Sequence, residues 1–273
     1  MEKKKIGWIG LGNIGLPMAK QLVKHGYKVT VCGHTRRQPV KEMKSLGASE
    51  VKTIREVAEA SDIVFSMVRD VPQTGEVLLG EQGLWEGMRA DQILVLSSTL
   101  LPSFCEEVER EGKGKGVTVL DAPVSGGPWG AEAGTLTFFV GGEEQAYRKC
   151  RPIMEAMGHN VFYLGQSGTG QAAKLANNLM LWAHTLVAGE AIDLARKAGL
   201  GPDKLLDTIK VSTGNSWVVQ NWRAYMDLMA PRETGVLDLL YKDIETALEY
   251  ARTQDLHLPF TSLIANMELP TFP

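Results

Sequence analysis

The chain has 273 residues, of which 44% are hydrophobic and 22% are charged, and its formal net charge is −3. This composition is typical of a globular protein with one or two domains, and it gives no electrostatic basis for binding nucleic acid or an anionic membrane. No apolar run approaches the roughly 20 residues that a membrane span needs. The apolar stretch behind the basic N-terminus is too short and too broken by glycine for a signal peptide.

The number and spacing of the cysteines indicate where the protein is located and argue against a zinc site. The chain has three cysteines, Cys32, Cys105 and Cys150, which lie far apart in the sequence. They have neither the spacing of a disulfide framework nor that of zinc ligands. We therefore expect free thiols, no metal site and a cytoplasmic protein.

The first predicted element is a short apolar strand at residues 5–9 that runs directly into a glycine-rich turn. A helical pattern at 17–24 and a second strand at 28–32 follow. This order is typical of a dinucleotide-binding unit, in which the glycines allow a tight turn, close approach of a pyrophosphate and close helix packing. We expect the turn to bind a dinucleotide through Gly10, Gly12, Asn13, Ile14 and Gly15.

The end of the second strand indicates which dinucleotide is bound. NAD-binding units usually carry an acid there for the ribose 2′-hydroxyl, but this chain has no acid between Cys32 and Glu42. Arg36 and Arg37 follow the strand instead, and guanidinium groups donate paired hydrogen bonds to phosphate oxygens. We predict NADP(H), with NAD(H) as the alternative, bound near His34, Thr35, Arg36 and Arg37. That the two arginines simply begin a solvated helix stays open.

Strands and helices alternate beyond this unit. The helical patterns cover residues 38–46, 54–60, 102–112 and 143–157, and the strands cover 62–68, 92–97, 116–121, 135–142 and 160–164. This alternation predicts an α/β fold with a Rossmann-type, doubly wound, mostly parallel sheet covered on both faces. Loops at the carboxyl ends of such strands face the ligand crevice. We therefore expect contacts to cofactor or substrate from Met67, Val68, Thr99 and the loop 121–127.

The segment Ser125-Gly126-Gly127 in that last loop is a candidate for binding a carboxylate. It offers a hydroxyl and closely spaced backbone N–H groups. The alternative is a flexible turn before Pro128.

A domain boundary is predicted in the glycine-rich stretch 165–170, giving a dinucleotide-binding domain at 1–166 and a helical domain at 167–273. The helical patterns cover 170–199, 202–211, 216–229 and 235–253. Lys174 and Asn178 lie one turn apart on the first of these helices. A cation and an amide together suit a substrate oxygen that gains or loses a proton, whereas most helical lysines are solvated surface residues.

Together these segments resemble the β-hydroxyacid dehydrogenase family, also called the 3-hydroxyisobutyrate dehydrogenase family. The resemblance implies NAD(P)-dependent oxidation of a small β-hydroxyacid, or reduction of its semialdehyde, and dimers or tetramers built through the helical domain. The matching segments, in family order, are Gly7 to Ala19, Asp121 to Gly127, Gly134 to Thr137 with Gly141-Gly142, Gly170 to Asn178, and Lys242-Asp243.

The resemblance also implies roles for single residues. Lys174 resembles the catalytic lysine, and Thr99 resembles the threonine beside the nicotinamide. Lys242 resembles the lysine that closes over the site from the helical domain. Residues that resemble substrate contacts are Ser125, Gly126, Gly127, Asn177, Asn178 and, as a weaker match, Trp217, for which a core tryptophan is the alternative.

The chain departs from the family at two places. His34 stands where NADP-using members often carry arginine, so the phosphate contact is expected to shift to Arg36 and Arg37. The sequence also stops at Pro273, where members usually continue through a further helix.

These observations predict an NADP(H)-preferring oxidoreductase that interconverts a small β- or γ-hydroxyacid and its semialdehyde, with Lys174 as general acid/base. 3-Hydroxyisobutyrate, 4-hydroxybutyrate, glyoxylate and tartronate semialdehyde all fit as substrate chemistry. One alternative is an imine reductase of the same architecture, although those enzymes generally carry Asp or Tyr in place of the lysine. The other is a non-catalytic nucleotide-binding module.

Overall fold

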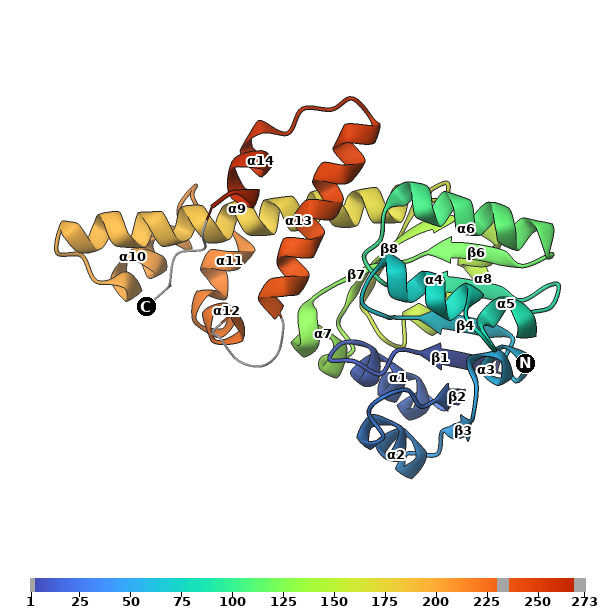
Figure 1. Ribbon diagram of the computed structural model, residues 1–273. Coiled ribbons are helices and arrows are strands. Elements are labelled where there is room, and N and C mark those ends of the chain that lie inside the picture. The colour runs from blue at the N-terminus through green and yellow to red at the C-terminus, as the bar shows by residue number, and fades with distance from the viewer. Residues whose placement is uncertain (1–2, 230–235, 268–273) are drawn as a thin grey trace. The chain divides into compact units, whose positions relative to one another are not determined.

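The computed structural model of the chain describes residues 3–229 and 236–267, with the backbone alone for 236–240. The chain divides into two compact units, Met1–Lys174 and Leu175–Pro273. Figure 1 traces the chain through both of them. Among the described residues, no helix combines the length and the apolar character that crossing a bilayer requires.

The described part of the first unit is built on one nine-stranded sheet, with the strand order β3-β2-β1-β4-β5-β6-β8-β7 and with β9 paired to β8 (Figure 1). Strands β1 to β6 are parallel, and β8 is antiparallel to both β6 and β7. The mostly parallel sheet predicted from the sequence is thus confirmed. The strands are β1 Lys5–Ile9, β2 Lys28–Cys32, β3 Ser49–Val51, β4 Ile63–Ser66, β5 Ile93–Leu96, β6 Thr118–Asp121, β7 Val124–Ser125, β8 Thr137–Gly142 and β9 Asn160–Gly165.

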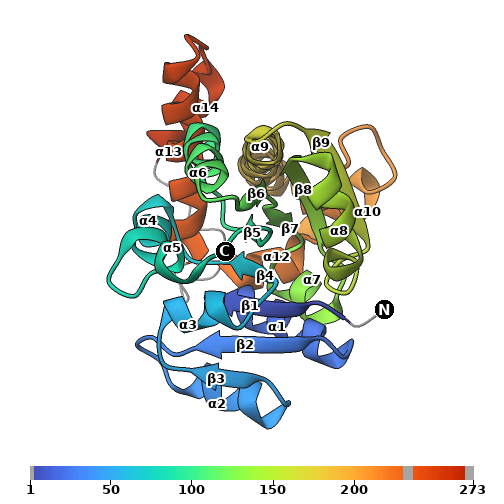
Figure 2. The ribbon, with the colours of Figure 1, turned by 90° about the vertical axis from the view of Figure 1, so that its right-hand side faces the viewer.

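Helices cover both faces of this sheet, as Figure 2 shows for α4, α5 and α6 on one side and α8 on the other. Each face has its own core because alternate strand residues point to opposite faces. Trp8 and Phe65 belong to one core and stack with ring centroids 5.5 Å apart, whereas Ile9 and Val64 belong to the other. The helices are α1 Gly15–Lys24, α2 Gln38–Ser45, α3 Ile54–Glu59, α4 Val71–Leu79, α5 Leu84–Gly87, α6 Pro102–Gly114, α7 Gly127–Ala133 and α8 Glu144–Met154.

Several short elements of this unit were not predicted. They are β3, β7 and the helices α4, α5 and α7. Helix α4 follows Asp70, whose side chain accepts a hydrogen bond from the Gln73 backbone N–H at 3.0 Å and so caps the helix. The segment 121–127, expected to be a loop, contains all of β7 and ends where α7 begins.

The described elements of the second unit are all helical, as predicted. Its core contains Trp182, Leu206, Val218 and Ile244, which are at most 5% exposed. The predicted start of a helix at residue 235 and the C-terminal residues 268–273 lie outside the described residues. The helices are α9 Thr169–Lys197, which begins in the first unit, α10 Pro202–Ile209, α11 Trp217–Gln220, α12 Trp222–Met229, α13 Val236–Thr253 and α14 Pro259–Ala265.

The helix predicted over 216–229 is broken at Asn221 into α11 and α12. The Asn221 side chain donates a hydrogen bond to the Trp217 carbonyl at 2.8 Å. Asparagine side chains compete with the backbone for such hydrogen bonds, which is why they often interrupt helices.

The start of α9 is bound to the end of β6 by a buried carboxylate. Asp121 is 0% exposed, and its two oxygens accept hydrogen bonds from the backbone N–H groups of Gly168 and Gln171 at 2.8 and 2.9 Å. A Cβ atom at Gly141 or Gly170 would lie 2.5 or 2.7 Å from this carboxylate, so both positions need glycine. The predicted linker 165–170 is therefore shorter and fixed, since β9 includes Gly165 and α9 begins at Thr169.

Gln171 joins the same helix start to the loop after β5. Its side chain is 0% exposed, accepts a hydrogen bond from the Leu100 backbone N–H and donates one to the Ser98 carbonyl, both at 2.9 Å. The first turn of α9 is consequently fixed against the carboxyl ends of both β5 and β6.

Burial raises the pKa of Asp121 to about 6, although hydrogen bonds from backbone N–H groups oppose this shift. The folded state therefore binds the proton more tightly than the unfolded state, and this carboxyl costs stability as the pH rises from 3.8 to about 6. The shift corresponds to about 3 kcal/mol.

Replacing Asp121 by Asn should remove this pH dependence. We expect the unfolding free energy of Asp121→Asn, relative to that of the wild type, to rise by about 2.4 kcal/mol between pH 4 and pH 7. Denaturant unfolding at the two pH values measures the difference. Asp91→Asn at an exposed position is the matched control, and its relative stability should not change. A relative stability of Asp121→Asn that is equal at both pH values would contradict the assignment.

Candidate functional site

The glycine turn after β1 is shaped by close backbone contacts at two of its glycines. Gly10 has a φ of +93°, and a Cβ there would lie 2.2 Å from the Met67 carbonyl oxygen. A Cβ at Gly15 would lie 2.1 Å from the Gly10 carbonyl oxygen. A Cβ at Gly12 would meet nothing within 4 Å, so the backbone there is open to a ligand. Within the turn Asn13 is exposed and Ile14 is half-buried.

Polar groups gather at the carboxyl ends of β4 and β5. The Ser98 hydroxyl donates a hydrogen bond to the Val68 carbonyl at 2.8 Å and so joins the two loops. Thr99, Met67 and Val68 are half-buried beside this contact. Two buried hydroxyls at the same edge, those of Ser66 and Ser97, have no hydrogen-bond partner among the described residues. Buried polar groups are normally satisfied by water or a ligand when the protein supplies no partner.

The end of β2 carries the four exposed residues expected to bind the 2′ substituent of the ribose, His34 to Arg37. Arg37 is not simply solvated, because its Nη2 lies 2.5 Å from Glu50 Oε1. The Lys44 Nζ lies 3.0 Å from the other oxygen of the same carboxylate. A Cβ at Gly33 would lie 2.4 Å from Arg37 Nη1, so the guanidinium lies over the first residue after β2.

The segment Ser125-Gly126-Gly127 connects the end of β7 directly to the start of α7. Ser125 pairs with Thr137 in the antiparallel register of β7 and β8. Gly126 and Gly127 have φ values of 129° and 63°, in the region that favours glycine, and α7 begins at Gly127. The half-buried Ser125 thus has a fixed backbone.

Lys174 and Asn178 both belong to α9, and their spacing places them one turn apart. Lys174 is half-buried in the first unit, one turn after Gln171. In the second unit Asn178 is 4% exposed, and its Nδ2 donates a hydrogen bond to Asp243 at 2.6 Å. Its amide oxygen accepts a hydrogen bond from Asn177 at 3.0 Å.

Asp243 also contacts the predicted cofactor lysine. Lys242 Nζ lies 3.1 Å from Asp243 Oδ1, and Asp243 is 8% exposed. The second unit therefore contains a polar chain that runs from Asn177 through Asn178 and Asp243 to Lys242. The contacts of Asp243 were not predicted, although Lys242-Asp243 is one of the segments that resemble the family.

Trp217 is not a core tryptophan, which corrects the alternative considered for it. Its side chain is 50% exposed and makes an edge-on ring contact with Tyr225 at 5.8 Å.

Three residues fix these loops through contacts that were not predicted from the sequence. Asp121 was expected to contact cofactor or substrate as part of the loop 121–127, but it ends β6, is 0% exposed and binds the start of α9 instead. Gln171 lies within the lysine motif, but its contacts with the loop after β5 are not visible in the sequence. Glu50 belongs to β3, which was not predicted.

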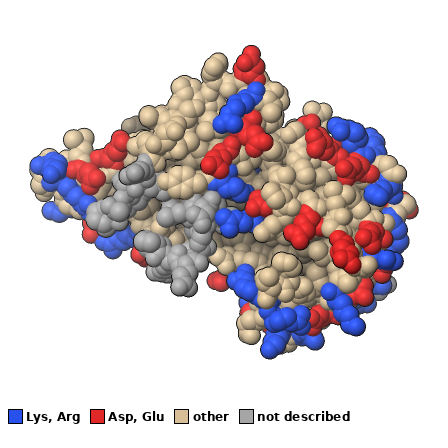
Figure 3. Space-filling model, viewed as in Figure 1, with Lys and Arg blue, Asp and Glu red and all other residues tan. Residues whose placement is uncertain are grey.

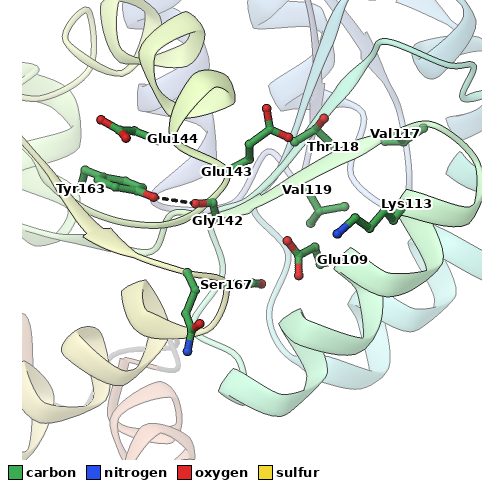
Figure 4. A pocket seen from close by; sticks show the side chains of 11 residues that line it. Glu109, Lys113, Val117, Thr118, Val119, Gly142, Glu143, Glu144, Tyr163 and Ser167 are labelled. Carbon is green, nitrogen blue, oxygen red and sulfur yellow. Dashed lines mark hydrogen bonds between the residues drawn. The ribbon is translucent and has the colours of Figure 1, made fainter.

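A cavity of about 370 Å³ in the first unit lies apart from these loops (Figure 4). Its walls include Thr118 at the amino end of β6 and Glu109 and Lys113 of α6. The Tyr163 hydroxyl donates a hydrogen bond to the Gly142 carbonyl at 3.0 Å in its wall. The predicted site residues lie instead at carboxyl strand ends, so this cavity is not the predicted site.

Charged side chains of both signs lie on the surface of the molecule. Lys and Arg side chains are interspersed with Asp and Glu over the face shown in Figure 3. Within residues 3–229 and 236–267, no group of three His, Cys, Asp or Glu side chains could hold a metal ion.

Two family descriptions match the chain. Residues 5–165 match the NAD-binding domain of 6-phosphogluconate dehydrogenase. Residues 168–269 match the NAD-binding domain of NADP-dependent 3-hydroxyisobutyrate dehydrogenase. These two matches meet at the predicted linker.

Relatives and solved structures agree with these matches. A 3-hydroxyisobutyrate dehydrogenase of Pseudomonas aeruginosa is 34% identical, over 96% of this chain and 90% of that protein. A 2-hydroxy-3-oxopropionate reductase of Escherichia coli is 36% identical, over 94% of this chain and 88% of that protein. The structure of a Mycobacterium tuberculosis 3-hydroxyisobutyrate dehydrogenase with L-serine has a TM-score of 0.82 at 30% identity, covering 97% of this chain and 92% of that one.

These similarities cover nearly the whole chain and are to enzymes, so the alternative of a non-catalytic nucleotide-binding module is wrong. The relatives are dehydrogenases and reductases that act on hydroxyl groups or the matching carbonyls. The chain belongs to the β-hydroxyacid dehydrogenase family and is an NAD(P)-dependent oxidoreductase that acts on CH–OH groups.

Proposed function

We propose that the protein is an NADP(H)-preferring oxidoreductase that interconverts a small β- or γ-hydroxyacid and its semialdehyde, with Lys174 as general acid/base. The observation that carries the proposal is the fixed start of α9. Asp121 and Gln171 hold its first turn at the carboxyl ends of β6 and β5, and Lys174 follows one turn later in the same unit. That edge of a parallel sheet is where ligands of such folds bind.

The residues at this edge fit a nicotinamide dinucleotide. No atom lies within 4 Å of where a Cβ of Gly12 would be, so a pyrophosphate can approach the backbone there. The guanidinium of Arg37 lies over Gly33, at the end of β2. When bound, the reduced cofactor supplies the hydride. For the phosphate-bearing form we propose contacts from Gly10, Gly12, Asn13, Ile14, Gly15, His34, Thr35, Arg36, Arg37, Met67, Val68, Thr99 and Lys242.

Lys174 then donates a proton to the substrate oxygen on which negative charge develops during reduction, and it accepts that proton in the reverse direction. Asn178 orients the same oxygen. Its amide is itself oriented by Asn177 and Asp243, which leaves one N–H for the substrate. The Ser125 hydroxyl and the Gly126-Gly127 backbone hold the substrate carboxylate. Asn177 and the half-exposed Trp217 complete the proposed substrate contacts.

The substrate is a small carboxylate with a hydroxyl or aldehyde group. The names of the relatives favour 3-hydroxyisobutyrate and 2-hydroxy-3-oxopropionate as the first compounds to assay. We would measure turnover with these two compounds and with succinic semialdehyde, glyoxylate and a cyclic imine. Turnover of the aldehydes supports a hydroxyacid dehydrogenase, whereas turnover of the cyclic imine supports an imine reductase.

We further propose that a dinucleotide-binding domain at 1–166 and a helical domain at 167–273 divide these roles. The last described strand ends at Gly165, which supports this boundary. A cytoplasmic location is supported by the free thiols of the three cysteines, of which Cys105 and Cys150 are buried.

The helical domain is also proposed to form a homo-oligomer, a dimer or a tetramer. Met180, Val187 and Leu194 recur every seven residues on α9 and are 60%, 54% and 76% exposed. This spacing places an apolar stripe on one face of the helix, which suits packing against the same face of a second copy.

Replacing Lys174 by Ala should abolish most of the activity. We expect kcat to fall roughly 10²- to 10⁴-fold, the range typical of losing a general acid. Steady-state oxidation of NADPH with the best substrate measures the change. Lys197→Ala, at the exposed last residue of the same helix, is the control and should retain wild-type kcat. A Lys174→Ala enzyme within a few-fold of wild type would exclude the role.

The paired variant Arg36→Ala/Arg37→Ala should raise the KM for NADPH and leave the KM for NADH nearly unchanged, because only the phosphate-bearing cofactor loses a bidentate contact. Initial rates with each cofactor at saturating substrate give both values. Equal changes for the two cofactors would show that the arginines do not contact the phosphate.

Val187→Glu should dissociate the oligomer, because a charge in an apolar interface loses its hydration. Light scattering coupled to size-exclusion chromatography gives the mass of wild type and variant. Thr208→Glu on α10, at an exposed polar position, is the control. An unchanged mass for Val187→Glu, or a monomeric wild type, would argue against this interface.

A further inference from the structure

Glu50 on β3 forms ion pairs with two basic side chains. Its Oε1 lies 2.5 Å from Arg37 Nη2, and its Oε2 lies 3.0 Å from Lys44 Nζ. The hydrogen bonds from Lys44 and Arg37 lower the pKa of Glu50, so the carboxylate is ionised at neutral pH. Its side chain is 18% exposed, whereas those of Arg37 and Lys44 are 57% and 53% exposed. Glu50 is thus the most enclosed of the three charges.

This cluster lies at the end of β2. In the parallel register Val31 pairs with Glu50 and Cys32 with Val51, so Glu50 is level with the last residues of β2. Arg37 extends from the start of α2 back over Gly33, the first residue after the strand. Dinucleotide-binding units recognise the ribose 2′ substituent at this place, usually with an acid supplied by β2 itself. Here the acid comes from the neighbouring strand.

We propose that Glu50 is a specificity-determining residue that weakens the binding of a 2′-phosphate and so reduces the preference for NADP(H) over NAD(H). It competes with the phosphate for Arg37 and Lys44. The inference rests on the proposed function in one respect, namely that Arg37 contacts the 2′-phosphate.

The charges decide the sign of the effect. Arg37 and Lys44 together carry two positive charges, and Glu50 reduces the local sum to one. A 2′-phosphate that approaches Arg37 is therefore repelled by a carboxylate at hydrogen-bond distance from the same guanidinium. A 2′-hydroxyl carries no charge and does not meet this repulsion. At the dielectric constant of bulk water, which suits exposed groups, the repulsion between one carboxylate and a doubly charged phosphate about 6 Å away corresponds to about a tenfold change in affinity.

Glu50 also orients Arg37, and losing that orientation would act in the opposite direction. This effect is the smaller one, because exposed ion pairs that involve long side chains contribute little. The removal of Glu50 should consequently strengthen NADP(H) binding and not weaken it.

The test is the binding of NADP⁺ and NAD⁺ to the full chain carrying Glu50→Gln, measured by calorimetry at low ionic strength. We expect the Kd for NADP⁺ to fall about tenfold and the Kd for NAD⁺ to change less than about twofold. The gain should shrink as salt is added, because salt screens exposed charges. Glu59→Gln is the matched control, since Glu59 is an exposed carboxylate paired with Arg55 at 2.7 Å, and it should alter neither Kd.

A second variant, Arg37→Met, separates this inference from the proposed function. If Arg37→Met leaves the Kd for NADP⁺ unchanged, the contact between Arg37 and the phosphate is wrong and the inference fails with it. If Arg37→Met weakens NADP⁺ binding but Glu50→Gln leaves it unchanged or weakens it, only the role of Glu50 is overturned. Equal strengthening of NADP⁺ and NAD⁺ by Glu50→Gln would also overturn that role, because the effect would not depend on the phosphate.

Discussion

The buried carboxylate of Asp121 is the contact on which the arrangement of the site depends. Asp121 is the last residue of β6, and its carboxylate accepts hydrogen bonds from two backbone N–H groups at the start of α9. Gly141 and Gly170 have no side chain, which leaves room for this carboxylate. Burial alone would make this carboxylate costly, as its raised pKa indicates. The backbone donors offset part of that cost, and in return the helix that carries Lys174 begins at a defined place.

Much of the fold follows from local signals in the sequence. The glycine turn, the buried apolar strands and the long α9 were predictable, because glycine spacing and hydrophobic periodicity act over a few residues. The strand β3 has only three residues and is defined by its register with β2, so no local pattern reveals it. The interruption between α11 and α12 depends on one side-chain hydrogen bond of Asn221, which periodicity does not detect.

The site was less predictable than the fold, because its side chains are paired across long stretches of sequence. No acid precedes Glu42 after β2, yet Glu50 reaches Arg37 from the next strand. The sequence motif places Asn178 one helical turn from Lys174. The amide of Asn178 nevertheless donates its hydrogen bond to Asp243, which lies far along the chain. Such pairings come from the tertiary fold, and a motif indicates the residues without indicating their partners.

The attachment of α9 to β6 also determines how such enzymes can be recombined. A chimaera joined within 166–168 would combine the Asp121 of one parent with the helix start of another, and would keep this contact only where the parent that supplies the helix has glycine at the position of Gly170. A junction placed after Lys174 transfers the helical part alone and leaves every hydrogen bond of that carboxylate within one parent. The crossover point for exchanging the helical part thus lies inside α9, and not in the loop that precedes it.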